Sequence, residues 1–179
     1  LTVYLSNRKN MKKYRYPIIA LVGLLTLVGF KNNYCQHNAV QKLILAPDIA
    51  QQELDATIMH GAGLYQLLTT DSVYTDVRVM NIELAPSSYF DWQTFPGGRM
   101  IIVTEGQGYY QTKGKDPMLI KKGDHIEIIA GLFHWIGSTP ESPLVFISIT
   151  AQKTDDLVNW HEPVSTAEYG KARGLQEPS

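Results

Sequence analysis

The sequence predicts an all-β protein built as a sandwich or a barrel. From residue 64 onward, short runs rich in Val, Ile, Tyr and Thr are separated by stretches of Gly, Pro, Ser and Asp. Runs of this kind at close spacing are typical of short antiparallel strands joined by tight turns. The chain has 179 residues, which is enough for a sizeable core, so we expect one domain.

The N-terminal residues 1–36 have the layout of an upstream extension followed by a secretory signal peptide. A positively charged stretch from Met11 to Arg15 precedes an uncharged apolar run from Pro17 to Phe30. The run is shorter than the roughly 20 residues that a membrane-spanning helix needs. We therefore expect a secreted or periplasmic protein with no stable membrane span after processing. An N-terminal membrane anchor and a buried helix are the alternatives.

Charge and cysteine content exclude several classes of partner. The formal net charge is -1, and no basic stripe runs along the chain, so no nucleic-acid partner is expected. Cys35 is the only cysteine. The chain can therefore build neither an internal disulfide framework nor a metal cluster held by thiolates.

The expected elements follow one another along the chain. Residues 37–60 are polar with scattered apolar positions and are expected to form a helical or extended arm. Residues 165–172 favour a short helix that begins on a Ser or Thr cap, and 171–179 are expected to form a flexible tail. Residues 61–170 are expected to form the barrel, with strands at 65–70, 73–84, 100–106, 108–114, 125–130 and 144–151.

Alternation along the predicted strands assigns side chains to faces. In 125–130, His125 and Glu127 share one face and two isoleucines share the other. The ionisable pair is therefore expected in solvent. Trp92 and Trp135 alternate to the face opposite their polar neighbours, and we expect them to pack on the barrel wall.

The stretch KKGDHIEIIAGLFHWIGSTPESPLVFISIT resembles the second conserved motif of the cupin superfamily, G-x5-P-x-G-x2-H-x3-N. Gly123, Gly131 and His134 stand at the matching spacing, whereas Ile129 and Ser138 occupy the Pro and Asn positions. The spacing of this motif is retained even where its residues differ.

Further stretches resemble the small single-domain cupins related to mandelonitrile lyase. These are WQTFPGGR, VTEGQG, HWIG, VFIS and NWHEPVSTAEY, and Gly106 matches the closing glycine of the first cupin motif. The resemblance covers about residues 60 to 170. It implies a cupin-type double-stranded β-helix, or jelly-roll barrel, with short N- and C-terminal arms, and a homodimer.

The metal ligands of that family fall on residues that bind metals poorly here. Carried over by position, they fall on Gln93, Phe95, Arg99 and His134. Phe95 has no lone pair, Gln93 offers a neutral amide oxygen, and Arg99 adds a positive charge beside a would-be dication. His134 alone is a good ligand. No cofactor is expected, although a weakly bound divalent metal at His134 stays open.

The same positions define the candidate ligand-binding residues. Period-2 alternation directs them into the barrel interior, and the family's further pocket histidines fall on Ile136 and Phe146. His134 is also the best candidate for a catalytic residue. The candidate set is Gln93, Phe95, Arg99, His134, Ile136 and Phe146.

Several functions remain compatible with this set. In one, Arg99 replaces the lost cation and binds a small carboxylate, with an aromatic or apolar body packed beside it. In another, Arg99 swings out to solvent, phenylalanines fill the hole, His134 is a core histidine and the protein is a non-catalytic scaffold. The alternatives are a lyase or isomerase that uses His134 as general acid or base, and a metal-dependent dioxygenase or lyase with other ligands.

Overall fold

The computed structural model describes residues 49–69, 76–151 and 157–175. The predicted signal peptide, the start of the predicted arm and the last four residues of the predicted tail lie outside these ranges. Within them, no helix has the length and apolar character needed to cross a membrane.

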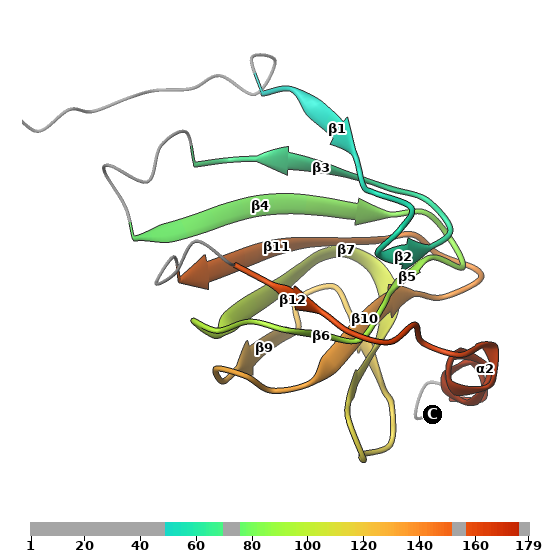
Figure 1. Ribbon diagram of the computed structural model, residues 1–179. Coiled ribbons are helices and arrows are strands. Elements are labelled where there is room, and N and C mark those ends of the chain that lie inside the picture. The colour runs from blue at the N-terminus through green and yellow to red at the C-terminus, as the bar shows by residue number, and fades with distance from the viewer. Residues whose placement is uncertain (1–48, 70–75, 152–156, 176–179) are drawn as a thin grey trace, which may run out of the picture. The chain divides into compact units, whose positions relative to one another are not determined.

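Twelve antiparallel strands form a continuous curled sheet, which confirms the predicted all-β fold (Figure 1). The main path runs β1-β3-β4-β11-β7-β10-β5-β2, and the remaining strands pair at its sides. The strands are β1 (Gln51–Glu53), β2 (Met59–His60), β3 (Gly63–Leu67), β4 (Val77–Leu84), β5 (Tyr89–Phe90), β6 (Gln93–Thr94), β7 (Arg99–Thr112), β8 (Met118–Lys121), β9 (His125–Ile128), β10 (His134–Ser138), β11 (Leu144–Ala151) and β12 (Asn159–Trp160).

Strand β7 changes the face it presents to the interior halfway along its length. Val145 of β11 pairs with Glu105, but the next residue, Phe146, pairs with Val103. One residue of β7 is therefore bulged out, and a bulge shifts the alternation of every later side chain. This shift turns the ring of Tyr110 into the barrel core.

Shortly after the bulge, at Gly106, the backbone has a φ of 74°. A β-carbon at this position would collide with the carbonyl oxygen of Pro143. Glycine is required here both by the left-handed conformation and by the close approach of the two backbones.

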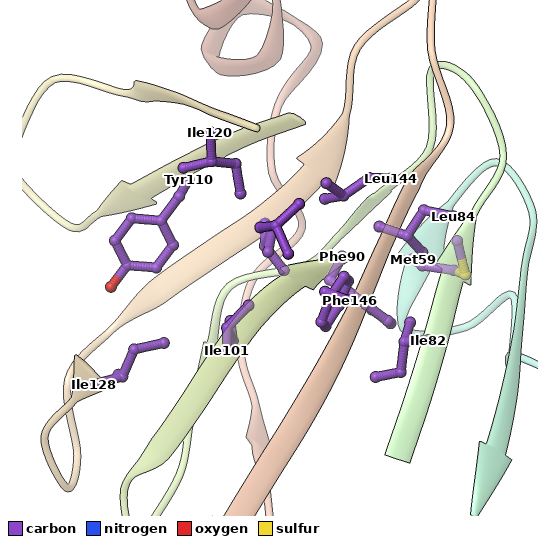
Figure 2. Packing of buried hydrophobic residues seen from close by; sticks show 12 residues of the cluster. Met59, Ile82, Leu84, Phe90, Ile101, Tyr110, Ile120, Ile128, Leu144 and Phe146 are labelled. Carbon is purple, nitrogen blue, oxygen red and sulfur yellow. The ribbon is translucent and has the colours of Figure 1, made fainter. Parts of the chain in front are cut away.

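Side chains of the inner faces form one apolar cluster inside the barrel. Figure 2 shows Ile82, Phe90 and Phe146 pointing into this core together with residues of the other strands. Leu144 and Phe146 are fully buried on the inner face of β11. The core fills one part of the barrel, and a cavity occupies the other part.

A second cluster lies outside the barrel, beneath helix α2 (Thr166–Arg173). It contains Trp92 and Trp135, which confirms that these tryptophans pack on the barrel wall. Ser165 caps the helix in a reciprocal capping box with Glu168, as predicted for a helix that begins on a hydroxyl residue. Figure 1 shows the C-terminal segment passing from β12 to this helix.

The sheet extends beyond the boundaries that the sequence predicts for the barrel. Residues 51–60, predicted as an arm, contribute β1 and β2, which pair with β3 and β5. At the other end, helix α2 continues to Arg173, so the predicted tail begins inside the helix. Within it, Lys171 Nζ donates a hydrogen bond to Asp116 at 2.6 Å.

Candidate functional site

A cavity of about 310 Å³ lies among residues of β1, β3, β4, β5, β6, β7, β11 and β12. This volume is at the lower end of the range for small-molecule sites. Most of the wall is apolar and comes from the inner faces of the strands. The polar part of the lining includes Glu53, Asp55, Arg78, Gln93, Arg99 and Thr150.

Arg99 is buried at the first position of β7 and is 5% exposed. Its Nε donates a hydrogen bond to Ser148 Oγ at 2.9 Å. The guanidinium carbon lies 4.6 Å from the ring centre of Phe95 and 5.5 Å from that of Phe146. These contacts hold the side chain inside, so one part of the scaffold alternative, that Arg99 swings out to solvent, is wrong.

The guanidinium charge is not neutralised by any carboxylate in the described part of the chain. Burial lowers the pKa of Arg99 to about 9, and a nearby tyrosine, Tyr110, opposes this shift. The group remains a cation at neutral pH. A buried cation without a counter-ion is costly, and a bound anion would relieve that cost.

Three residues of the cavity wall carry buried polar atoms that have no hydrogen-bond partner. They are Arg99 Nη1, Gln93 Nε2 and Thr150 Oγ1. Buried polar groups in proteins are almost always paired, so these unpaired groups favour a polar partner at this wall, either ordered water or a ligand. Two of the three atoms can only donate, which favours a ligand that accepts hydrogen bonds.

His134 lies deeper in the barrel and does not line the cavity. Its Nδ1 lies 2.8 Å from the carbonyl oxygen of Leu132. Because a carbonyl can only accept, Nδ1 carries the proton and Nε2 keeps its lone pair, which has no partner. Burial lowers the pKa of His134 to about 4; the hydrogen bond with Leu132 opposes this shift, and the charge of Arg99 contributes to it. The ring is therefore neutral at physiological pH.

Two aromatic rings surround His134. Phe95 stacks on it with ring centres 5.7 Å apart, and Tyr110 lies tilted at 5.8 Å. Burial raises the pKa of Tyr110 to about 12, so the phenol stays protonated. The imidazole thus sits in a largely apolar environment behind Phe95, which itself lines the cavity.

The structure divides the six predicted ligand-binding residues into two groups. Gln93, Phe95 and Arg99 line the cavity. His134, Ile136 and Phe146 also face the interior, but they are fully buried in the packed region and reach no part of the cavity wall. The reason is that the apolar end of the barrel is tightly packed around His134, Ile136 and Phe146. The polar end, which holds Gln93 and Arg99, is not tightly packed.

Several residues of the site were not identified from the sequence. Ser148 and Thr150 follow Leu144 and Phe146 on the inner face of β11, and strict alternation along this strand would have found them. Arg78 is also part of the wall. It alternates with Met80 and Ile82 on β4, so strict alternation along this strand would have placed it on the inner face as well. The predicted surface residue His125 is exposed, as expected.

The positions that hold metal in the family do not fit a divalent cation here. Phe95 offers no donor atom, and the buried guanidinium of Arg99 would repel a dication. Among the described residues, no group of three or more His, Cys, Asp or Glu side chains is arranged to hold a metal ion. The Nε2 atom of His134 is a good ligand that lacks companions.

Comparisons with known proteins agree with this architecture. No protein-family model matches the chain. The (R)-mandelonitrile lyase of Granulicella tundricola is 29% identical over 89 residues, which is 50% of this chain and 68% of that protein. The crystal structure of a cupin-like protein from Thermotoga maritima is 32% identical, with a TM-score of 0.66, and the match covers 69% of this chain and 94% of that one.

More distant structures share the fold alone. The polyketide cyclase RemF from Streptomyces resistomycificus is 15% identical, with a TM-score of 0.60, over 72% of this chain and 90% of that one. A predicted oxalate decarboxylase from Thermotoga maritima is 20% identical, with a TM-score of 0.55, over 60% and 96%. The similar proteins thus include a lyase, a cyclase and a predicted decarboxylase. By its barrel, its motif spacing and its likeness to the Thermotoga maritima cupin, the chain belongs to the cupin superfamily.

Proposed function

We propose that this cupin barrel binds a small organic carboxylate without a metal, with Arg99 as the principal anchor. The observation that carries the proposal is the buried guanidinium, with no counter-ion among the described residues, in the wall of a cavity whose other buried polar atoms also lack partners. A carboxylate accepts several hydrogen bonds at once and supplies the missing negative charge.

The energetics favour an anion at this place. Two opposite charges about 4 Å apart attract each other by about 4 kcal/mol at an effective dielectric constant of 20. Arg99 is already desolvated in the protein, so only the ligand gives up water when the pair forms. Ser148 holds Nε, which leaves the remaining nitrogens of the guanidinium for the ligand.

The apolar wall favours a ligand with a hydrocarbon part. The apolar side chains in the cavity wall include Ile58, Met80, Ile82, Phe90 and Trp160. Burying an aromatic or branched group against these side chains gives a hydrophobic contribution of roughly 25 cal/mol per Å². A charged head group on a compact apolar body therefore matches both parts of the lining.

The experiment is a calorimetric titration of the full chain with 4-phenylbutanoate and with the uncharged 4-phenylbutan-1-ol. We expect the acid to bind and the alcohol to bind at least about tenfold more weakly, because it lacks the charge-assisted contact. Arg99→Met should remove this preference while keeping a flexible side chain of similar length. Arg173→Met is the control, because Arg173 is exposed on helix α2.

Folding of the variant is checked by circular dichroism and thermal unfolding. Replacing a buried, unneutralised charge by an apolar side chain is often neutral or stabilising, so Arg99→Met should fold. Equal affinity for acid and alcohol, or an unchanged preference in a folded Arg99→Met protein, would contradict the proposal. Absence of all binding would favour the scaffold alternative.

A second candidate function is a lyase or isomerase in which His134 moves a proton. The unpartnered lone pair of Nε2 favours it, as does the similarity to a mandelonitrile lyase. Against it stands the lowered pKa of about 4, which makes this imidazole a weak base. This function would be supported if the wild-type protein catalysed the breakdown of mandelonitrile and the His134→Asn variant did not.

A further inference from the structure

We propose that the ligand is a dicarboxylate, with one carboxylate at Arg99 and the second at Arg78. This inference rests on the proposed function and adds a second anchor to the same cavity. Both arginines line the cavity wall.

The two arginines lie on one rung of the sheet. Thr150 of β11 pairs with Arg78 of β4 on one side and with Arg99 of β7 on the other. Directly paired residues project to the same face. The two arginine backbones are therefore two strands apart, about 10 Å, with the hydroxyl of Thr150 between them. Long guanidinium side chains can reach two carboxylates of one small molecule across this span.

The charges on the rung favour two negative groups. Arg99 is buried and Arg78 is half-buried. Neither makes an ion pair with a carboxylate of the described residues. The unpartnered Thr150 Oγ1 lies on the same rung and can donate to either carboxylate. A monocarboxylate would neutralise one arginine, whereas a dicarboxylate neutralises both.

The acidic residues of the lining are placed far from this rung. Glu53 pairs with Leu64, and Leu64 pairs with Glu83 of β4. Glu83 is five residues from Arg78 on the same strand, so the rung of Glu53 lies about 16 Å along the sheet from the rung of Arg78. Asp55 is directed into its own turn, where Oδ1 accepts a hydrogen bond from the Thr57 backbone N–H at 2.8 Å. The cavity is thus polarised, with its cationic end at the rung.

The test compares 2-benzylsuccinate with 4-phenylbutanoate, which is the same skeleton without one carboxylate. Affinities are measured by calorimetry for the full chain, the Arg78→Gln and Arg78→Lys variants, and the Arg173→Gln control. We expect the wild type to bind the dicarboxylate at least about tenfold more tightly, as for a charge-assisted contact. Arg78→Gln should remove this difference, because it should weaken 2-benzylsuccinate far more than 4-phenylbutanoate. Arg78→Lys should restore part of it.

The outcomes separate the two proposals. If 4-phenylbutanoate binds as tightly as benzylsuccinate, or Arg78→Gln weakens both equally, the dicarboxylate inference fails and the carboxylate site at Arg99 stands. If phenyl phosphate binds more tightly than benzylsuccinate and depends on Arg78, the dianion is a phosphate ester and the inference is overturned. If neither acid binds the wild type, both proposals fail.

Discussion

The hydrogen bond from Arg99 Nε to Ser148 Oγ, at 2.9 Å, fixes the direction of the only arginine that the described residues bury in the barrel. The two residues come from adjacent strands and share the inner face of the sheet. Ser148 is therefore a positioning residue, because it orients the group that contacts the ligand in our proposal.

Ser148→Ala tests this role. The variant should lose about 1 kcal/mol of unfolding free energy, the typical value of one hydrogen bond, and should bind 4-phenylbutanoate several-fold more weakly. Denaturant unfolding and calorimetry measure the two effects. Ser142→Ala removes a hydroxyl from a half-buried loop position outside the cavity wall and should leave the affinity unchanged. Equal affinities of wild type and Ser148→Ala would argue against positioning.

Acid should destabilise the protein through His134. Its pKa is lowered to about 4 in the folded state from an ordinary value of 6.5, so the unfolded chain binds the proton more readily between these values. The contribution to stability is fully present above pH 6.5 and is lost as the pH falls toward 4. It amounts to about 3 kcal/mol for one group.

This dependence is measured as the free energy of unfolding at a series of pH values. In His134→Asn the slope between pH 6.5 and 4 should fall by about 1.4 kcal/mol per pH unit. The matched control is His125→Asn, which makes the same replacement at an exposed histidine. If His134→Asn kept the wild-type dependence of unfolding free energy on pH, the imidazole of His134 would be protonated in the folded protein at little cost.

The site should take up little metal. With Phe95 and Arg99 at two family ligand positions, His134 is left without the companions that firm binding requires. Protein purified without added metal should contain well under one equivalent of iron, manganese, nickel or zinc by elemental analysis. Added metal should not raise the melting temperature. Near one equivalent of any of them would contradict this prediction.

Gly106 should be among the least replaceable residues of the barrel. Gly106→Ala adds a β-carbon that collides with the Pro143 carbonyl, at a φ of 74°. We expect a loss above about 3 kcal/mol, because strain and collision act together. Gly114 has a φ of 77° but open space around it, so Gly114→Ala should cost only about 1 kcal/mol. Similar losses in both variants would mean that the bulge absorbs the extra atom.

The sequence predicted the family, most strands and the capped helix because these depend on local signals. Motif spacing identified Gly106, Gly123 and His134 at cupin positions, and Ser165 has the hydroxyl that starts the helix. The edge strand β1 was missed, since its three exposed polar residues have no alternating pattern. Its formation depends on pairing with β3.

The sequence by itself determined which groups are available in the barrel: an arginine and a phenylalanine where the family has metal ligands, and one remaining histidine. Only the tertiary structure decided where these groups lie. It places Arg99 in the cavity wall and His134 behind Phe95, and it brings Arg78 onto the rung of Thr150 and Arg99. The physical reason is that strand register and the bulge in β7 join residues far apart in sequence, and no local pattern encodes that pairing.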